Sequence, residues 1–313
     1  MTETLHADEL IVAPATVRAL VDRDLPGYAD RPLERLAASG STNTLYRLGD
    51  DLLVRLPRQP GGGVAIAKEA RWSPLVTDGF PVPTPQIVAV GEPGFGYPEQ
   101  WSVVRWLEGS HPEVVDPTRP ASADRSGLAA GLADVITALR AAPIPREAVA
   151  DPALRWYRGE PLITRDEPTR EHFRQCRAIA DLDLDLDGAE QVWEQAMRLP
   201  GIDEPHGEHW FHGDLLAENL LVDDGRLTGV LDFGSLSIGD PTIDLHGAWE
   251  ILDPAGREVL RQRAGIDEPT WLRGRAWALS IAVMTFPYYW RTMPQRCASR
   301  LAMARAVLAE AQA

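Results

Sequence analysis

The part of the sequence with the clearest chemical potential runs from Phe211 to Gly234, FHGDLLAENLLVDDGRLTGVLDFG. It contains two carboxylates, Asp214 and Asp232, and one amide between them, Asn219. Carboxylate and amide oxygens are the hard ligands that Mg²⁺ prefers. A separate carboxylate beside such a metal can act as a base toward a hydroxyl group. These residue types suit phosphoryl transfer, in which the protein neutralises phosphates and orients a nucleophile.

A predicted β-hairpin brings these side chains toward one another. Leu220–Val222 and Thr228–Phe233 are apolar, β-branched stretches typical of strands. The turn between them contains an Asp-Gly pair, which is a strong short-range signal for a hairpin. Because Asn219 and Asp232 lie at the open end of this hairpin, its folding should place them side by side.

Two motifs in this stretch resemble the catalytic sequences of protein kinases, HxDxxxxN followed by DFG. The form HGDxxxxN, present from His212 to Asn219, is characteristic of the aminoglycoside phosphotransferase family. The resemblance implies that Asp214 orients the attacking hydroxyl and accepts its proton, and that Asn219 and Asp232 hold Mg²⁺. The alternative is an unrelated α/β protein in which Asp214 caps a loop and Asp232 ends a strand.

A short gap follows the second motif. The GDPxxDL element, Gly239–Leu245, comes soon after Gly234 and also resembles the phosphotransferase family. Protein kinases have a long activation segment and an APE motif here, and the arginine of their HRD motif is replaced by Gly213. A peptide substrate therefore has no evident platform. Asp244, near the start of a predicted helix, is expected to brace the catalytic loop.

A small polar loop, Ser39–Thr44, separates the segment LERLA from the predicted strand LYRL. Such a loop allows backbone N–H groups to approach phosphate oxygens. In the family that the chain resembles, a loop at this place covers the nucleotide phosphates, so Ser41, Thr42 and Asn43 are candidate contacts. The kinase GxGxxG pattern is absent, and an ordinary hairpin turn is the alternative.

The run Leu52–Pro57 is predicted to be the third strand, and the position of the kinase lysine corresponds to Arg55. A planar guanidinium can bind a phosphate and a carboxylate together, although it does not replace lysine neutrally. The predicted helix Val64–Thr77 carries Glu69, which matches the glutamate that pairs with this cation in kinases. The alternatives are a surface arginine in a strand and an exposed glutamate on a helix.

The segment Trp101–Gly109 is predicted to be a buried strand and resembles the last strand and hinge of a kinase small lobe. The resemblance implies that backbone groups near Arg105 and Leu107 bond the nucleotide base. A stretch rich in proline and polar residues follows, so we place a domain boundary there. Residues 1–109 are the predicted nucleotide-binding lobe, and residues 110–313 the predicted catalytic and substrate-binding lobe.

The sequence HGEHWFH places His206, His209 and His212 at three-residue spacing. Histidines at such spacing raise the hypothesis of a metal site. The kinase-like interpretation competes with it, because it gives His212 a structural role in the catalytic loop.

Length and composition are those of a globular protein of about two domains. The chain has 313 residues, of which 44% are hydrophobic and 25% charged. Its two cysteines, Cys176 and Cys297, have no CxxC spacing, which predicts a reducing cytoplasm rather than a zinc site or a disulfide framework. No secretory signal opens the sequence, and the apolar stretch Ala276–Trp290 is too short to span a membrane. It is predicted to be a core helix that ends at Pro287.

With 31 basic and 46 acidic residues, the net charge of −15 argues against a nucleic-acid partner. The acidic field would favour a cationic partner, although it also merely keeps a protein soluble. Acidic residues that we expect to steer a cationic acceptor are Glu160, Asp166, Glu167 and the run Asp181–Asp187. Aromatic residues that would pack a core or suit a more apolar ligand are Trp277, Phe286, Tyr288, Tyr289 and Trp290.

These observations together predict a bilobal, protein-kinase-like α+β fold with a small antiparallel-sheet lobe and a larger helical lobe. The resemblance implies an ATP- or GTP-dependent, Mg²⁺-requiring kinase of a small hydroxylated molecule, with an aminoglycoside-type antibiotic as the first candidate acceptor. A macrolide or an ordinary hydroxylated metabolite is an alternative acceptor. A nucleotide-binding pseudokinase scaffold is the alternative from another functional class.

Overall fold

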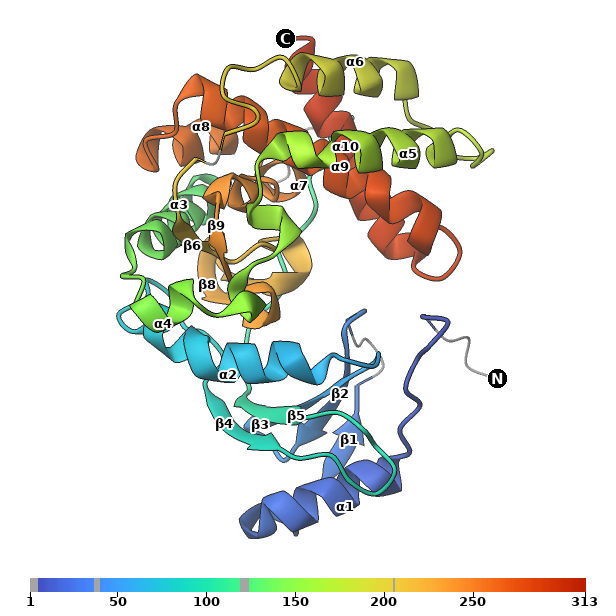
Figure 1. Ribbon diagram of the computed structural model, residues 1–313, viewed down its shortest axis with the longest axis vertical. Coiled ribbons are helices and arrows are strands. Elements are labelled where there is room, and N and C mark those ends of the chain that lie inside the picture. Colours follow the sequence, from blue (N-terminus) through green and yellow to red (C-terminus); the bar gives the residue numbers. More distant parts are fainter. Residues whose placement is uncertain (1–4, 37–39, 119–123, 205) are drawn as a thin grey trace. The chain divides into compact units, whose positions relative to one another are not determined.

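The computed structural model describes residues 5–36, 40–118, 124–204 and 206–313. Ser39, part of the predicted phosphate loop, lies outside the described residues. The chain forms two compact units, whose elements are labelled in Figure 1. The first comprises Met1–Asp78, Pro83–Glu108 and Asp232–Ser235, and the second Gly79–Val82, Gly109–Leu231 and Leu236–Ala313. The predicted division into functional lobes, 1–109 and 110–313, stays a prediction.

A five-stranded antiparallel sheet of order β1-β2-β3-β5-β4 is the framework of the first unit. Its strands are β1 (Leu33–Arg35), β2 (Asn43–Leu48), β3 (Leu52–Pro57), β4 (Ile87–Gly91) and β5 (Trp101–Arg105). The predicted bounds of β3 are confirmed. The strand predicted over Trp101–Gly109 ends earlier, at Arg105, because its partner β3 begins at Leu52, opposite Arg105.

The α-helices among the described residues of this unit are α1 (Pro14–Asp24) and α2 (Gly63–Thr77). Alternate residues of the strands turn to one face of the sheet and meet α1 in one apolar core. Members of that core include Val17, Leu20, Val21, Tyr46, Leu48, Val54 and Leu56. The predicted helix over Val64–Thr77 is confirmed as α2, and it presents Glu69 on its buried side.

The second unit is mostly helical (Figure 1). Its helices are α3 (Ser126–Ala141), α4 (Arg146–Val149), α5 (Asp166–Cys176), α6 (Leu186–Ala196), α7 (Ala248–Ile251), α8 (Pro254–Arg263), α9 (Glu268–Tyr289) and α10 (Pro294–Ala311). Strand β6 (His209–Phe211) pairs with β9 (Ser237–Gly239), and β7 (Leu220–Asp223) pairs with β8 (Arg226–Val230). The predicted α+β class is therefore confirmed. No helix among the described residues has the length and apolar composition needed to cross a membrane.

The predicted hairpin is present, but its second strand ends before the DFG motif. Asp224 and Gly225 both have positive φ, 44° and 71°, as a two-residue turn of type I′ requires. The strand predicted over Thr228–Phe233 is observed as Arg226–Val230. Asp232 has a φ of 56°, which takes the backbone out of the extended conformation and ends strand pairing before this residue.

Helix α9 continues past Pro287 to Tyr289, so the prediction that it ends at the proline is wrong. A proline in a helix removes one N–H group and leaves the carbonyl four residues earlier without its donor. That carbonyl belongs to Val283, and the thiol of Cys176 donates to it at 3.4 Å. Only the last turn of the helix follows the proline, so the disturbance is small.

Candidate active site

Strand β6 leads directly into the loop that carries Asp214. The carboxylate of Asp244, which is 1% exposed, accepts the N–H groups of His212 and Gly213 at 2.9 and 2.7 Å. Burial raises the pKa of Asp244, and these two N–H donors oppose that effect because they favour the ionised form. The prediction that Asp244 braces the catalytic loop is confirmed.

The ring of His212 connects the start of this loop to the end of the hairpin. The N–H of Asp214 donates to Nδ1 at 3.2 Å, so the ring proton lies on Nε2, which donates to the carbonyl of Leu231 at 2.9 Å. The predicted structural role of His212 is confirmed. The other two histidines face backbone carbonyls, His206 that of Gly201 and His209 that of Arg140.

The hypothesis of a metal site built from three histidines is wrong. Each ring of the three is engaged with a different backbone carbonyl, and within the described ranges no cluster of three or more His, Cys, Asp or Glu side chains is arranged to hold a metal ion. Of the three, His209 alone lies within β6, and the other two flank the strand, so their spacing does not reflect shared ligation.

The carboxylate of Asp214 is held on both of its oxygens. Nη1 of Arg158 donates to Oδ1 at 3.0 Å, and Nδ2 of Asn219 donates to Oδ2 at 2.8 Å. The same amide nitrogen donates to the backbone carbonyl of Asp214 at 2.9 Å. The side chain of Asp214 is 28% exposed, so the carboxylate is oriented by these contacts while remaining accessible.

Asp214 stays ionised in this setting. Burial would raise its pKa, but the positive charges of Arg158 and Arg300 outweigh burial and lower the pKa to about 2. A charged His246 would also lower the pKa of Asp214, but burial lowers the pKa of the His246 ring to about 3, so it is neutral near pH 7. The two arginines are therefore the cations that keep Asp214 charged.

Arg158 is a site residue that the sequence did not reveal. It lies in a short 3₁₀ turn, Tyr157–Gly159, and is fixed by donating to the carbonyl of Gly213 at 2.5 Å and by stacking 4.4 Å from the ring of Trp156. Gly213 has a φ of 80°, and a Cβ there would lie 2.9 Å from Trp156. Glycine is thus required at this position, because only it tolerates both the conformation and the approach.

The loop is also held on the side of Asn219. Glu250 of α7 accepts the N–H of Ala217 at 2.8 Å, and Arg300 of α10 is paired with both Glu250 and Glu218. Glu250 and Arg300 carried no signal in the sequence, since neither belongs to a motif. Glu218 lies inside the HGDxxxxN motif, at one of its unspecified positions.

In the first unit, Arg55 and Glu69 form a bidentate ion pair. Nη1 and Nη2 of Arg55 lie 3.0 and 2.6 Å from the two carboxylate oxygens of Glu69, and Nε donates to Ser102 at 3.1 Å. Their side chains are 6% and 3% exposed. The structure thus brings together the two residues that the sequence matched to the kinase lysine and glutamate, and neither is exposed on the surface.

Asp232 belongs to the same compact unit as this pair. Burial lowers the pKa of Arg55, but the negative charges of Glu69 and Asp232 more than offset it and raise the pKa above its usual value. Asp232 accepts the N–H of Gly234 at 3.2 Å through Oδ1, and the following Phe233 is buried at 1% exposure. The DFG carboxylate and the strand cation are therefore electrostatic neighbours.

The carbonyl groups of the predicted phosphate loop point toward neighbouring protein donors. The carbonyl of Ser41 faces Nε2 of His6 at 2.7 Å, and that of Thr42 accepts the N–H of Arg58 at 2.9 Å. The guanidinium of Arg58 donates to the carbonyl of Asn43 at 3.3 Å. Among described residues, Oδ1 of Asn43 is buried and has no hydrogen-bond partner.

The two predicted base-binding positions differ in their surroundings. Arg105 is exposed at the end of β5, where its side chain pairs with Asp51 at 2.6 Å and its N–H donates to the carbonyl of Gln86 at 2.8 Å. Leu107 is half-buried just beyond the strand. The N–H of Arg105 is thus already used within the sheet, and the part of both residues in binding a base stays a prediction.

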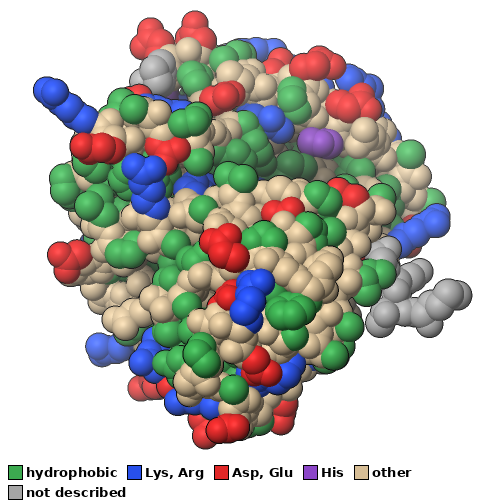
Figure 2. Space-filling view, turned by 60° about the horizontal axis from the view of Figure 1, so that its bottom comes forward, with side chains coloured by type: hydrophobic (Ala, Val, Ile, Leu, Met, Phe, Trp, Pro, Cys, Tyr) green, Lys and Arg blue, Asp and Glu red, His purple; other side chains and the backbone are tan. Residues whose placement is uncertain are grey.

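Most of the acidic residues expected to steer a cationic acceptor are engaged by protein groups. Asp166 pairs with Arg170, Glu167 with Arg174, Asp183 with Arg305 and Asp187 with Arg177, and Asp185 caps helix α6. Figure 2 shows acidic and basic side chains interspersed on the face in view. Within the described part of the chain, nearby positive charges therefore weaken the negative electrostatic field of these carboxylates.

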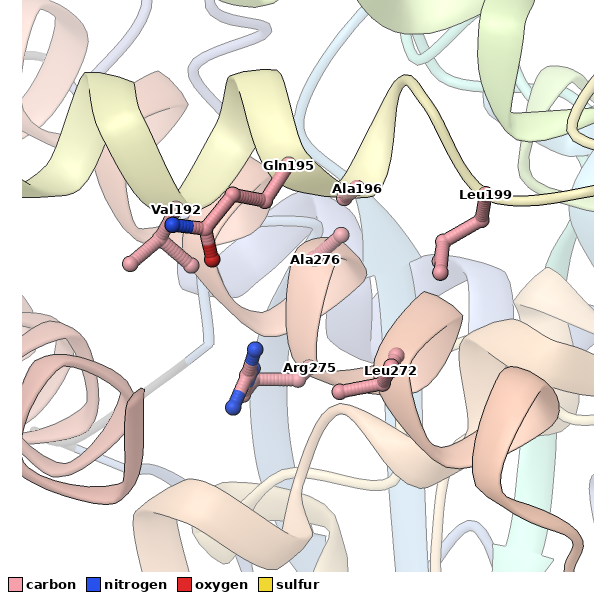
Figure 3. A pocket seen from close by; sticks show the side chains of 7 residues that line it. All are labelled: Val192, Gln195, Ala196, Leu199, Leu272, Arg275 and Ala276. Atoms are coloured by element: carbon pink, nitrogen blue, oxygen red, sulfur yellow. The ribbon is translucent and has the colours of Figure 1, made fainter. Parts of the chain in front are cut away.

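A small pocket lies between α6 and α9, away from the residues described above (Figure 3). Its lining consists of Val192, Gln195, Ala196, Leu199, Leu272, Arg275 and Ala276. Its volume of about 60 Å³ suits water rather than a nucleotide or an antibiotic, because ligand pockets measure several hundred Å³. This pocket is not a substrate site.

Comparison with known proteins connects these features to one family. The model of the phosphotransferase enzyme family matches residues 34–277. The chain is similar to an aminoglycoside 3'-phosphotransferase from Escherichia coli, with 36% identity over 97 residues, 29% of this chain and 35% of the relative. A Salmonella typhimurium aminoglycoside 3'-phosphotransferase is 34% identical over 95 residues, 29% of this chain and 34% of the relative. These alignments span about a third of the curated relatives.

Solved structures resemble the chain over nearly its full length. The GDP complex of wild-type aminoglycoside 2'-phosphotransferase-IIIa has a TM-score of 0.70 at 19% identity and covers 96% of this chain and 100% of its own. The macrolide 2'-phosphotransferase MphH from Brachybacterium faecium has a TM-score of 0.60 at 22% identity, with 94% and 98% covered. They confirm the predicted kinase-like α+β fold. The family match over residues 34–277, with the HGD and DFG motifs inside it, shows that this chain belongs to the phosphotransferase enzyme family.

Proposed function

We propose that this chain is a nucleoside-triphosphate-dependent O-phosphotransferase of a small hydroxylated molecule, with aminoglycoside-type antibiotics as the first acceptor class. The observation that carries the proposal is the ionised carboxylate of Asp214, held by Arg158 on one oxygen and by Asn219 on the other. A carboxylate fixed in this way can accept a hydrogen bond from a hydroxyl group and take its proton. A pseudokinase scaffold would not need a carboxylate that is oriented by a hydrogen bond on each oxygen.

In the proposed reaction, the acceptor hydroxyl oxygen forms a bond to the γ-phosphorus while the bond to the β–γ bridging oxygen breaks. Asp214 orients the hydroxyl and receives its proton, and the nucleoside diphosphate leaves. Arg55, anchored by Glu69, steadies the donor phosphates through its positive charge. Positioning and charge neutralisation supply most of the catalysis in such a transfer.

Asn219 and Asp232 are the proposed ligands of Mg²⁺. Since Nδ2 of Asn219 donates to Asp214, the amide carbonyl oxygen is the atom left for a cation. Asp232 offers a charged oxygen. Mg²⁺ in kinase sites uses one or two protein carboxylates with phosphate and water oxygens, so this donor set fits it. When bound, the ion would neutralise charge on the β- and γ-phosphates.

ATP or GTP is the proposed donor. Related structures are complexes with GDP, ADP and ATP. In our proposal Ser41, Thr42 and Asn43 face the phosphates. Their carbonyls are engaged by protein donors, which favours the N–H side of the loop for anion contact. Arg105 and Leu107 are the proposed neighbours of the base.

A macrolide or another weakly charged hydroxylated molecule is the second candidate acceptor. The curated relatives are aminoglycoside 3'-phosphotransferases, which favours the first class, and one structural neighbour is a macrolide 2'-phosphotransferase, which favours the second. The pairing of the acidic residues also favours the second class, because neutralised carboxylates attract a polycation less strongly. Phosphoryl transfer itself is common to both candidates.

The test is nucleotide consumption with Mg²⁺ and either ATP or GTP, against aminoglycosides, macrolides and hydroxylated metabolites, at low and high salt. We expect transfer to at least one antibiotic class. A polycationic acceptor should bind more weakly as salt rises, whereas an acceptor held by apolar contacts should respond little. Absence of transfer to every acceptor, with intact nucleotide binding, would refute the kinase proposal in favour of a scaffold.

We place this reaction in the cytoplasm, without nucleic-acid or membrane partners. Cys176 and Cys297 are free, buried thiols, as expected where disulfides do not form. The net charge of −15 opposes binding to phosphate backbones.

A further inference from the structure

A buried ion bridge joins helix α10 to the loop that carries Asp214. Arg300, which is 2% exposed, donates through Nη1 to Oε1 of Glu250 and through Nη2 to Oε1 of Glu218, the latter at 2.6 Å. Glu250 is 0% exposed, and its Oε2 accepts the N–H of Ala217 at 2.8 Å. The bridge therefore contacts two successive loop residues, Ala217 and Glu218. They lie between the proposed base Asp214 and the proposed metal ligand Asn219.

The chemistry of this bridge suits the task of fixing a loop. The planar fork of an arginine can hold two carboxylates in one geometry, which a lysine ammonium cannot do with the same directionality. The stability of the fold alone does not explain a buried ion bridge, because well-packed apolar residues at such positions often stabilise a protein as well or better. An ion bridge at this place is better explained by the loop that it positions.

We propose that Arg300 is a positioning residue of the phosphotransfer reaction, which through Glu250 and Glu218 holds the Asp214–Asn219 loop in its working geometry. Helix α10 begins at Pro294, beyond residues 34–277 that match the family model. The positive charge of Arg300 also acts on the carboxylate of Asp214. The inference rests on the proposed function of Asp214 as the base.

Two variants separate the effect of the planar guanidinium fork of Arg300 from the effect of its positive charge. Arg300→Lys keeps the charge and loses the fork, whereas Arg300→Met loses both. Arg305→Lys and Arg305→Met are the matched controls, since Arg305 lies on the same helix and pairs with Asp183, whose side chain is 92% exposed. We expect kcat to fall by about 10-fold or more in both Arg300 variants, because small displacements of reacting groups cost about that much or more. KM and the Kd of the nucleotide should change little, and the Arg305 variants should match the wild type.

The division of the effect between kcat and KM distinguishes positioning near the base from a merely structural role. A displaced loop should lower kcat while KM and the nucleotide Kd stay near their wild-type values. Wild-type kcat in Arg300→Lys would overturn the proposal. A fall in kcat matched by equal losses in KM and in nucleotide affinity would overturn it as well.

Amide hydrogen exchange over residues 211–222 gives a readout that does not depend on turnover. The N–H of Ala217 should exchange faster in the Arg300 variants and in Glu218→Gln than in the Arg305 controls. Glu218→Gln leaves Arg300 its partner Glu250, so it keeps the test decisive if Arg300→Met does not fold. If the wild type transfers no phosphate, the proposed function is refuted. The amide exchange rates then still test whether the ion bridge holds the loop. Equal exchange in Arg300→Lys, Glu218→Gln and the controls would overturn this inference.

Discussion

Nη1 of Arg158 lies 3.0 Å from Oδ1 of Asp214, and the same nitrogen donates to the carbonyl of Gly213 at 2.5 Å. One guanidinium thereby fixes both the carboxylate and the backbone that precedes it. Because Arg158 is itself buried and stacked on Trp156, its position does not depend on a bound substrate. The carboxylate of Asp214, the proposed base, is thus oriented before an acceptor arrives, which is the arrangement that efficient proton transfer needs.

Removal of the Asp214 charge should abolish most of the turnover while the fold persists. Asp214→Asn keeps the shape of the side chain but cannot accept the hydroxyl proton, so kcat should fall on the order of 10²-fold or more. Nucleotide affinity, measured by calorimetry, should change little. Asp223→Asn, on the exposed end of the hairpin strand β7, is the control and should retain full activity. Turnover of Asp214→Asn within a few-fold of the wild type would reject the role of base.

Arg158→Met should destabilise the protein in a pH-dependent way. The pKa of Asp214 is lowered from 3.8 to about 2, so its ionised form stabilises the folded state above pH 3.8, and this stabilisation is lost as the pH falls toward about 2. Without Arg158 the half-buried carboxylate of Asp214 loses its nearest positive charge, and its pKa rises. The difference in the free energy of unfolding between wild type and variant should therefore be largest near neutral pH and narrow as acid protonates the carboxylate.

Urea denaturation at neutral and acidic pH measures this difference. The control is Arg155→Met, because the ion pair of Arg155 with Glu208 is exposed to solvent at 40% and 55% of the two side chains. Such a pair contributes less than about 1 kcal/mol. A difference for Arg158→Met that stays constant with pH would show that its charge does not act on Asp214.

The buried pair Arg55–Glu69 should show opposite effects on stability and on nucleotide binding when both residues are replaced. Glu69→Leu leaves a buried guanidinium without its partner and should cost about 3–5 kcal/mol in the free energy of unfolding. Arg55→Leu with Glu69→Leu removes both charges and should recover most of that loss. Nucleotide affinity should remain low in the double variant, because the cation proposed to face the phosphates is gone.

Chemical denaturation and calorimetry on the two single variants and the double variant test this pair. Losses of stability that simply add in the double variant would mean that the two side chains do not compensate each other. Wild-type nucleotide affinity in Arg55→Leu would exclude Arg55 from phosphate binding.

Asp232→Ala should weaken Mg²⁺-dependent nucleotide binding more than Asn219→Ala does. Asp232 supplies a charged oxygen, whereas Asn219 supplies a neutral carbonyl and also orients Asp214. Asn219→Ala should therefore lower kcat beyond its effect on metal affinity. Calorimetric titration of nucleotide with Mg²⁺ and with EDTA separates the two effects. The same metal dependence in the wild type and both variants would count against these ligands.

Local sequence patterns determined the elements and motifs of this protein. The largely apolar run Leu52–Pro57 predicted β3 with its observed bounds, and an Asp-Gly pair predicted the β7–β8 turn. The bracing role of Asp244 also followed from its motif. The strand and the turn depend on interactions between residues close in sequence, which propensity and periodicity describe. Where Pro287 lies in α9, the local rule failed, because a thiol distant in sequence satisfies the freed carbonyl.

Only the tertiary structure decided which side chains surround Asp214. Arg158 comes from an irregular segment, Glu250 from α7 and Arg300 from α10, and each reaches the loop through packing of elements far apart in sequence. No periodicity encodes such contacts, because burial and charge pairing are set by the whole fold rather than by neighbours along the chain. The sequence thus specified Asp214 and the motif that contains it, whereas folding selected the arginines that keep Asp214 ionised and in place.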